Sequence, residues 1–120
     1  MLINLSNHPS ANWQSEQLSA AQSFGEITDI SFPSVDPNGD ESYIRTLCDE
    51  YVEKVIQSAQ GTKATVHVMG EMTLTYSLVH ALQSKGFICV ASTSQRIIAD
   101  KGDGVKEVQF VFNRFRKYSF

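Results

Sequence analysis

Apolar positions along this chain repeat with two periods, one typical of strands and one typical of helices. Short apolar segments at 2–6, 27–32, 64–69 and 87–91 have the length of buried strands. Between them, apolar residues recur at helical spacing over 13–24, over 41–58 and from near Met72 to Lys85. Strands and helices that alternate through short connections predict right-handed crossovers around a parallel sheet.

The C-terminal third departs from this alternation. Apolar segments at 96–99 and 105–112 flank a glycine-rich turn at 100–104, which predicts an antiparallel hairpin. The fold class is therefore α/β, a single Rossmann-like three-layer domain over residues 1–120. Its sheet is mostly parallel, with a C-terminal antiparallel hairpin. Basic and aromatic residues alternate over 113–120, as expected for an edge strand with one packed face or for a surface that meets a partner or an anion.

The amino-acid composition limits the kinds of partner and ligand that we expect for this chain. The 120 residues carry 10 Lys and Arg against 13 Asp and Glu, a net charge of −3, so we expect no binding to long duplex nucleic acid. A small anionic ligand needs only helix-end donors and one or two cations, so the net charge does not argue against it.

Cys48 and Cys89 lie in apolar segments without metal-ligand spacing, which favours buried thiols in a reducing cytoplasm. Neither a membrane span nor a signal peptide is predicted.

Polar residues follow the predicted strands where parallel strands would end together. Ser6, Asn7 and His8 follow the first strand, and Ser92 and Thr93 follow the fourth, with Arg96 close behind. Gly70, Glu71, Met72 and Thr73 lie between the third strand and its helix. Because ligands of open α/β sheets bind at this edge, we expect these side chains to form a binding site.

Each group suits a nucleotide in a different way. Gly70 permits close backbone approach, and the helix that begins near Met72 offers free N–H groups to an anion, unless Glu71 or Thr73 caps it. His8 is the natural general acid or base near neutral pH. Capping of the next helix and orientation of Pro9 are equally open roles for it. Arg96 suits a bidentate phosphate contact. Beside a phosphate, Glu71 would have to contact ribose hydroxyls, pair with Arg96, bind a metal or face away.

Several familiar site motifs are absent from the sequence. It holds no GxGxxG, GxxxxGK[ST], GxSxG or HExxH, so we predict no dinucleotide, no P-loop nucleotide, no metal and no other cofactor. His67 lies in a predicted strand and His80 in a predicted helix, which favours packed or surface roles over catalysis.

Three segments resemble the small stand-alone CRISPR-associated Rossmann-fold (CARF) proteins, including the compact ring nucleases. They are Leu5-Ser6-Asn7-His8-Pro9, the turn and helix over 69–86, and the strand over 90–96. The resemblance implies a homodimer that binds cyclic oligoadenylate across paired strand ends. It implies metal-independent cleavage, in which a ribose 2′-OH attacks the neighbouring phosphorus and leaves a 2′,3′-cyclic phosphate.

Carried over to this chain, the resemblance gives catalytic roles to His8 and Arg96. Ser6, Asn7, Ser92, Thr93 and the segment 70–73 would contact the ligand. One departure is that the lysine-bearing glycine-rich turn common in CARF sensors is absent, and Glu71 stands near its place. Two other hypotheses stay open: a non-catalytic sensor or sponge for the same ligand, and an α/β interaction subunit that uses the hairpin and tail.

Overall fold

The structure is a computed structural model and describes residues 1–119. Strands and helices alternate along most of the chain, and a short 3-10 turn at Ser10–Asn12 follows the first strand. The strands are β1 (Leu2–Ser6), β2 (Ile27–Ser31), β3 (Thr65–Met69), β4 (Ile88–Asp100) and β5 (Lys106–Lys117). The helices are α1 (Ser15–Gln22), α2 (Glu41–Ala59) and α3 (Met72–Ser84).

The strands form one sheet in the order β2-β1-β3-β4-β5. The strands β2, β1, β3 and β4 all run parallel to one another, and β5 runs antiparallel to β4. All five residues of β1 are buried, which agrees with its place between two parallel neighbours and two helical layers. The α/β fold class and the C-terminal antiparallel hairpin that the sequence predicts are thus confirmed.

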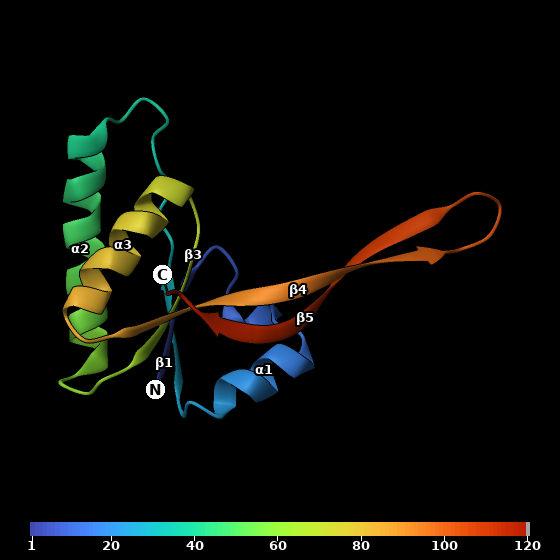
Figure 1. Cartoon of the computed structure of the whole chain (residues 1–120), viewed down its shortest axis with the longest axis horizontal. Coiled ribbons are helices and arrows are strands. Elements are labelled where there is room, and N and C mark those ends of the chain that lie inside the picture. Colours follow the sequence, from blue (N-terminus) through green and yellow to red (C-terminus); the bar gives the residue numbers. More distant parts are fainter. Residues whose placement is uncertain (120) are drawn as a thin grey trace.

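Helices cover the two faces of the sheet unequally. On one face, α2 and α3 lie side by side and pack on alternate strand residues such as Ile3, Val66 and Cys89 (Figure 1). On the other face, Ala21 of α1 and Trp13, which lies just before this helix, pack against Leu2 and Val90. The single short helix leaves part of this second face open beyond Trp13, where the carboxyl ends of the strands lie.

The residues at which α2 and α1 begin are determined by their immediate neighbours in the sequence. The side chain of Asp40 accepts a hydrogen bond from the Tyr43 N–H at 3.0 Å, so α2 begins where the sequence predicts. The helix predicted from Trp13 begins instead at Ser15, because Trp13 ends the 3-10 turn in extended conformation. Trp13 is nevertheless buried, as its apolar character predicts.

The fourth strand corrects the prediction. The sequence predicts an end near Ala91, but β4 continues to Asp100 through the hydroxyl-rich residues Ser92, Thr93 and Ser94. These residues stay extended because β5 pairs with them, with a bulge between Thr93 and Ser94. Residues 113–117 of the tail form the edge strand that the sequence favours. Phe120 lies outside the described residues.

Beyond Val90, β4 has no pairing with β3, so the hairpin leaves the body of the molecule with β5 alone. We call residues 94–112 the arm, which projects from the sheet in Figure 1 and contributes to overall dimensions of 52 × 38 × 28 Å. No helix among residues 1–119 is both long enough and apolar enough to cross a membrane.

Candidate functional site

A cavity of about 490 Å³ lies on the α1 face of the sheet, at the carboxyl ends of β1 and β3 and beside the middle of β4. We call it the polar cavity, because most of its lining side chains carry an amide, a hydroxyl or an imidazole group. The lining residues are Asn7, His8, Pro9, Asn12, Trp13, Gln14, Gln17, His67, Met69, Ser92, Thr93, Ser94, Phe110 and Phe112. The cavity therefore brings together four residues predicted from the sequence: Asn7, His8, Ser92 and Thr93.

The loop after β1 is fixed through its backbone. The His8 carbonyl oxygen accepts hydrogen bonds from Asn4 Nδ2 at 2.9 Å and Trp13 Nε1 at 3.0 Å. The side chains of Asn7 and His8 are exposed, and they make no hydrogen bond to another residue within 1–119. These two side chains are consequently available to a ligand on a rigid loop.

Ser6 has a structural position instead. It is buried, and its hydroxyl donates to Asn4 Oδ1 at 2.7 Å and accepts from the His8 N–H at 3.2 Å. Ser6 would therefore influence a ligand through the position of the loop that it holds, and not through the direct contact that the sequence predicts.

The hydroxyl groups on β4 have internal partners as well. Thr93 Oγ1 donates to the Arg114 carbonyl at 3.0 Å and accepts from the Arg114 N–H at 3.2 Å, which satisfies the backbone at the bulge. Ser92 Oγ lies 3.1 Å from the Met69 sulfur, where β3 ends and β4 continues. Both residues line the polar cavity, but a ligand would have to share their hydroxyls with these partners.

Aromatic side chains form the apolar part of the polar cavity. Trp13, Phe110 and Phe112 line it, and Phe112 packs on Phe115 with ring centroids 5.1 Å apart. Gln14 ties the start of α1 to β5, since its Nε2 donates to the Phe110 carbonyl at 2.9 Å and its Oε1 accepts from the Phe112 N–H at 3.1 Å. Aromatic faces beside amide groups suit a planar heterocycle such as a nucleobase.

A row of polar side chains crosses the sheet beside this cavity. Asp29, Asn4 and His67 lie opposite one another on β2, β1 and β3. Asn4 Nδ2 donates to Asp29 Oδ1 at 2.8 Å, and Asn4 Oδ1 lies 2.8 Å from His67 Nδ1. Burial, and to a smaller extent the charge of His8, lowers the pKa of His67 from 6.5 to about 4.

His67 is a cavity residue that sequence reasoning did not assign to the site. The packed role predicted from its strand position is correct, since its ring contacts Trp13 and Phe115 edge to face. The sequence signal was a polar residue at the centre of an otherwise apolar strand, matched by Asn4 at the centre of β1. Buried polar residues of this kind need partners, and two of them on neighbouring strands can supply each other.

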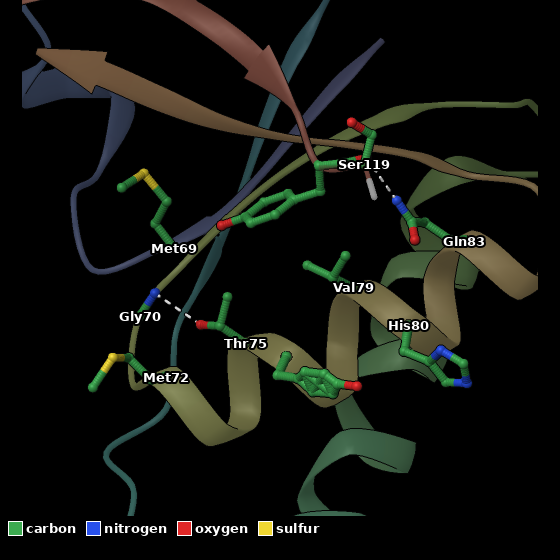
Figure 2. A pocket seen from close by; sticks show the side chains of 10 residues that line it. Met69, Gly70, Met72, Thr75, Val79, His80, Gln83 and Ser119 are labelled. Carbon is green, nitrogen blue, oxygen red and sulfur yellow. Dashed lines mark hydrogen bonds between the residues drawn. The ribbon is translucent and has the colours of Figure 1, made fainter.

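The segment between β3 and α3 faces a second, more apolar cavity of about 460 Å³ on the opposite side of the sheet edge (Figure 2). Its lining residues are Met69, Gly70, Met72, Thr75, Tyr76, Val79, His80, Gln83, Tyr118 and Ser119. The Gly70 N–H donates to Thr75 Oγ1 at 3.1 Å, as Figure 2 shows. Gly70 and Met72 are thus separated from the polar cavity by the end of the sheet.

The absence of a side chain at Gly70 does permit a close approach, as the sequence predicts. The group that approaches is the Phe32 ring of the protein itself and not a ligand. A Cβ atom added at Gly70 would overlap the ring of Phe32, which is buried just after β2. Glycine at this position therefore allows Phe32 to pack across the end of the sheet.

Glu71 caps α3, which is one of the roles that the sequence leaves open for it. Its carboxylate accepts from the N–H groups of Thr73 at 2.9 Å and Leu74 at 3.0 Å, and Thr73 Oγ1 donates to the same carboxylate at 2.8 Å. These backbone hydrogen bonds lower the pKa of Glu71. The start of α3, which the sequence offers to the anion of a ligand, is thus occupied by the carboxylate of Glu71.

Arg96 lies on the arm, outside the residues that line the polar cavity. Its register partner is Phe110, and directly opposed residues of an antiparallel pair share a face of the sheet. Arg96 therefore stands on the same face of the arm as Phe110, which lines the polar cavity.

Comparison with known proteins identifies a family for this chain, but it does not assign an activity. Neither the search of curated proteins nor the search of solved structures gives a match. The model of the uncharacterized protein MJ1673 family matches residues 1–116, nearly the whole chain. The chain therefore belongs to the MJ1673 family.

Proposed function

We propose that this chain binds a cyclic oligoadenylate at the polar cavity and cleaves it as a metal-independent ring nuclease of CARF type. The observation that carries the proposal is the polar cavity itself. It lies at the carboxyl ends of parallel strands and combines the exposed side chains of Asn7 and His8 with three aromatic residues. Such a lining offers stacking to adenine and hydrogen bonds to ribose and phosphate oxygens.

The proposed reaction requires few protein groups. The ribose 2′ oxygen forms a bond to the adjacent phosphorus, the bond from phosphorus to the 5′ oxygen breaks, and a 2′,3′-cyclic phosphate remains. The 2′-OH loses a proton and the 5′ oxygen gains one. His8 serves as general acid or base, and Arg96 stabilises the negative charge that develops on the phosphate. Positioning by the fixed loop supplies much of the remaining rate enhancement.

A second copy of the chain is part of this proposal. One face of the arm carries the exposed residues Ile98, Val108 and Phe110, of which Phe110 is 61% exposed. A two-stranded hairpin is marginally stable by itself in water, so this face needs a cover. A homodimer with two-fold symmetry would pair the same face of two arms and place two polar cavities on one ring-shaped ligand.

The test is incubation of the purified protein with labelled cyclic tri-, tetra- and hexa-adenylate in EDTA, followed by chromatography. Linear products that end in 2′,3′-cyclic phosphate support the ring nuclease. His8→Ala and Arg96→Ala should each lower the cleavage rate by about 100-fold or more. His80→Ala and Arg45→Ala, which replace the same residue types outside the polar cavity, should leave the rate unchanged.

A non-catalytic sensor or sponge is the second candidate. It is favoured by the internal hydrogen bonds of Ser6 and Thr93, which leave few free groups for catalysis. Intact ligand that co-elutes with the protein would support this candidate and contradict cleavage. If no ring is bound or cleaved, both candidates are wrong.

A further inference from the structure

One buried polar atom of the site has no partner in the protein. Nε2 of His67 makes no hydrogen bond within the described residues, although His67 is only 1% exposed. His67 is also one of the residues that line the polar cavity. A buried polar atom without a partner carries a desolvation cost, unless something outside the chain satisfies it.

The neighbours of Asn4 decide which hydrogen-bonding role this atom has. Asn4 Nδ2 faces two acceptors, Asp29 Oδ1 at 2.8 Å and the His8 carbonyl at 2.9 Å, so the amide nitrogen must lie on that side. Asn4 Oδ1 consequently faces His67 Nδ1, and an amide oxygen can only accept. Nδ1 of His67 therefore carries the proton, and Nε2 presents a lone pair.

The ring is also held in direction. Asn4 lies opposite His67 on β1, so Nε2, on the other side of the ring, is directed away from β1. Trp13 and Phe115 contact the ring edge to face, each with centroids 5.5 Å from it. The two hydrogen bonds that link Asp29 to Asn4 and Asn4 to His67 thus fix both the tautomer and the orientation of the imidazole.

We propose that Nε2 of His67 accepts a hydrogen bond from an uncharged donor of the nucleotide in the polar cavity, either a ribose hydroxyl or the adenine amino group. This inference rests on the proposed function for the identity of the ligand. His67 is a binding and positioning residue in this role. Burial keeps its imidazole neutral near pH 7, so it orients the donor and does not store a proton.

The first test uses the wild-type protein with ¹⁵N-labelled histidine and adenosine 5′-monophosphate as the probe. In the free protein at pH 7, the spectrum should show His67 with its proton on Nδ1. At saturating nucleotide, the Nε2 resonance of His67 should move and that of His80 should not. Either inosine monophosphate or 2′,3′-dideoxyadenosine monophosphate should fail to move it, and the analogue that fails identifies the donor as amino group or hydroxyl.

The second test is His67→Phe, with His80→Phe as the matched control on the exposed surface of α3. Phenylalanine keeps the ring between Trp13 and Phe115, and Asn4 Oδ1 keeps the Ser6 hydroxyl as a donor, so this variant should fold. Loss of one hydrogen bond in a buried site should weaken binding of adenosine monophosphate by about tenfold. The variant should also lose the discrimination between adenosine monophosphate and the analogue identified above, whereas the control should keep both.

Several results would overturn the inference. They are a proton on Nε2, an Nε2 resonance that no nucleotide moves, one that both analogues move equally, and unchanged affinity in His67→Phe. Failure of the proposed function looks different: cyclic oligoadenylates would be neither bound nor cleaved while adenosine monophosphate still moves the resonance. Conversely, rings that bind without moving it would contradict the role of His67 alone.

Discussion

The imidazole of His67 should make folding sensitive to mild acid. Its pKa is about 4 in the folded protein, whereas an unfolded chain has a histidine pKa of about 6.5. Between these values the unfolded state binds the proton more tightly, so stability is full above pH 6.5 and declines as the pH falls toward 4. The difference corresponds to about 3 kcal/mol of unfolding free energy.

The measurement is urea unfolding of wild type and His67→Phe at pH 7 and pH 4.5. Carboxylates are common to both proteins, so subtracting the two pH dependences isolates the histidine. The stability of His67→Phe should fall less between the two pH values than that of wild type. Parallel losses in both proteins would show that the pKa of His67 is the same in the folded and the unfolded state.

Glu71 should stabilise the start of α3 in a manner that also depends on pH. Because its pKa is lowered in the folded state, this contribution is present above the ordinary carboxyl pKa of about 4.3 and is lost as the pH falls through the lower folded value. Replacing it with alanine removes an N-cap, which costs about 0.5–2 kcal/mol at pH 7.

Chemical denaturation of Glu71→Ala at pH 7 and pH 3 checks this expectation. The difference from wild type should shrink at the lower pH. Glu26→Ala is the matched control, since the exposed side chain of Glu26 makes no hydrogen bond within residues 1–119. An equal loss in both variants would argue against the cap.

At the scale of elements, the contact between Gly70 and Phe32 joins the segment after β3 to the segment after β2. Gly70→Ala should cost about 1–3 kcal/mol, because the new methyl group meets the Phe32 ring. Phe32→Leu should restore space at that position, so the double variant should lose less stability than the sum of the single variants. Unfolding curves of the four proteins provide the test, and strictly additive losses would contradict the contact.

Elements with signals inside their own sequence were predictable, and those that depend on distant partners were not. The structure places the start of α2 where Asp40 predicts it, because a cap acts within one helical turn. The length of β4 was wrong, because Ser92–Ser94 resemble a loop locally and become a strand through pairing with β5. Likewise, Asn7 and His8 could be placed at the sheet edge from the strand pattern, but His67 depends on Asn4, 63 residues away.

At the scale of the whole molecule, the arm makes the strongest case for a second copy. Its strands pair so that Ile98 and Val108 share one face with Phe110, whereas Ile97 and Gln109 lie on the other. Ile98 is 52% exposed and Val108 is 45% exposed. The first face continues into the polar cavity through Phe110 and Phe112, so a dimer formed there would join two sites.

Neighbouring residues on opposite faces provide a sharp test of this dimer. Ile98→Glu buries a charge in the proposed interface and should weaken dimerisation by about 30-fold or more. Ile97→Glu adds the same charge one residue away on the other face and should leave dimerisation unchanged. Sedimentation equilibrium of wild type and both variants measures this. A wild-type monomer at all concentrations, or equal effects of the two variants, would contradict the interface and would leave the arm to a different protein partner.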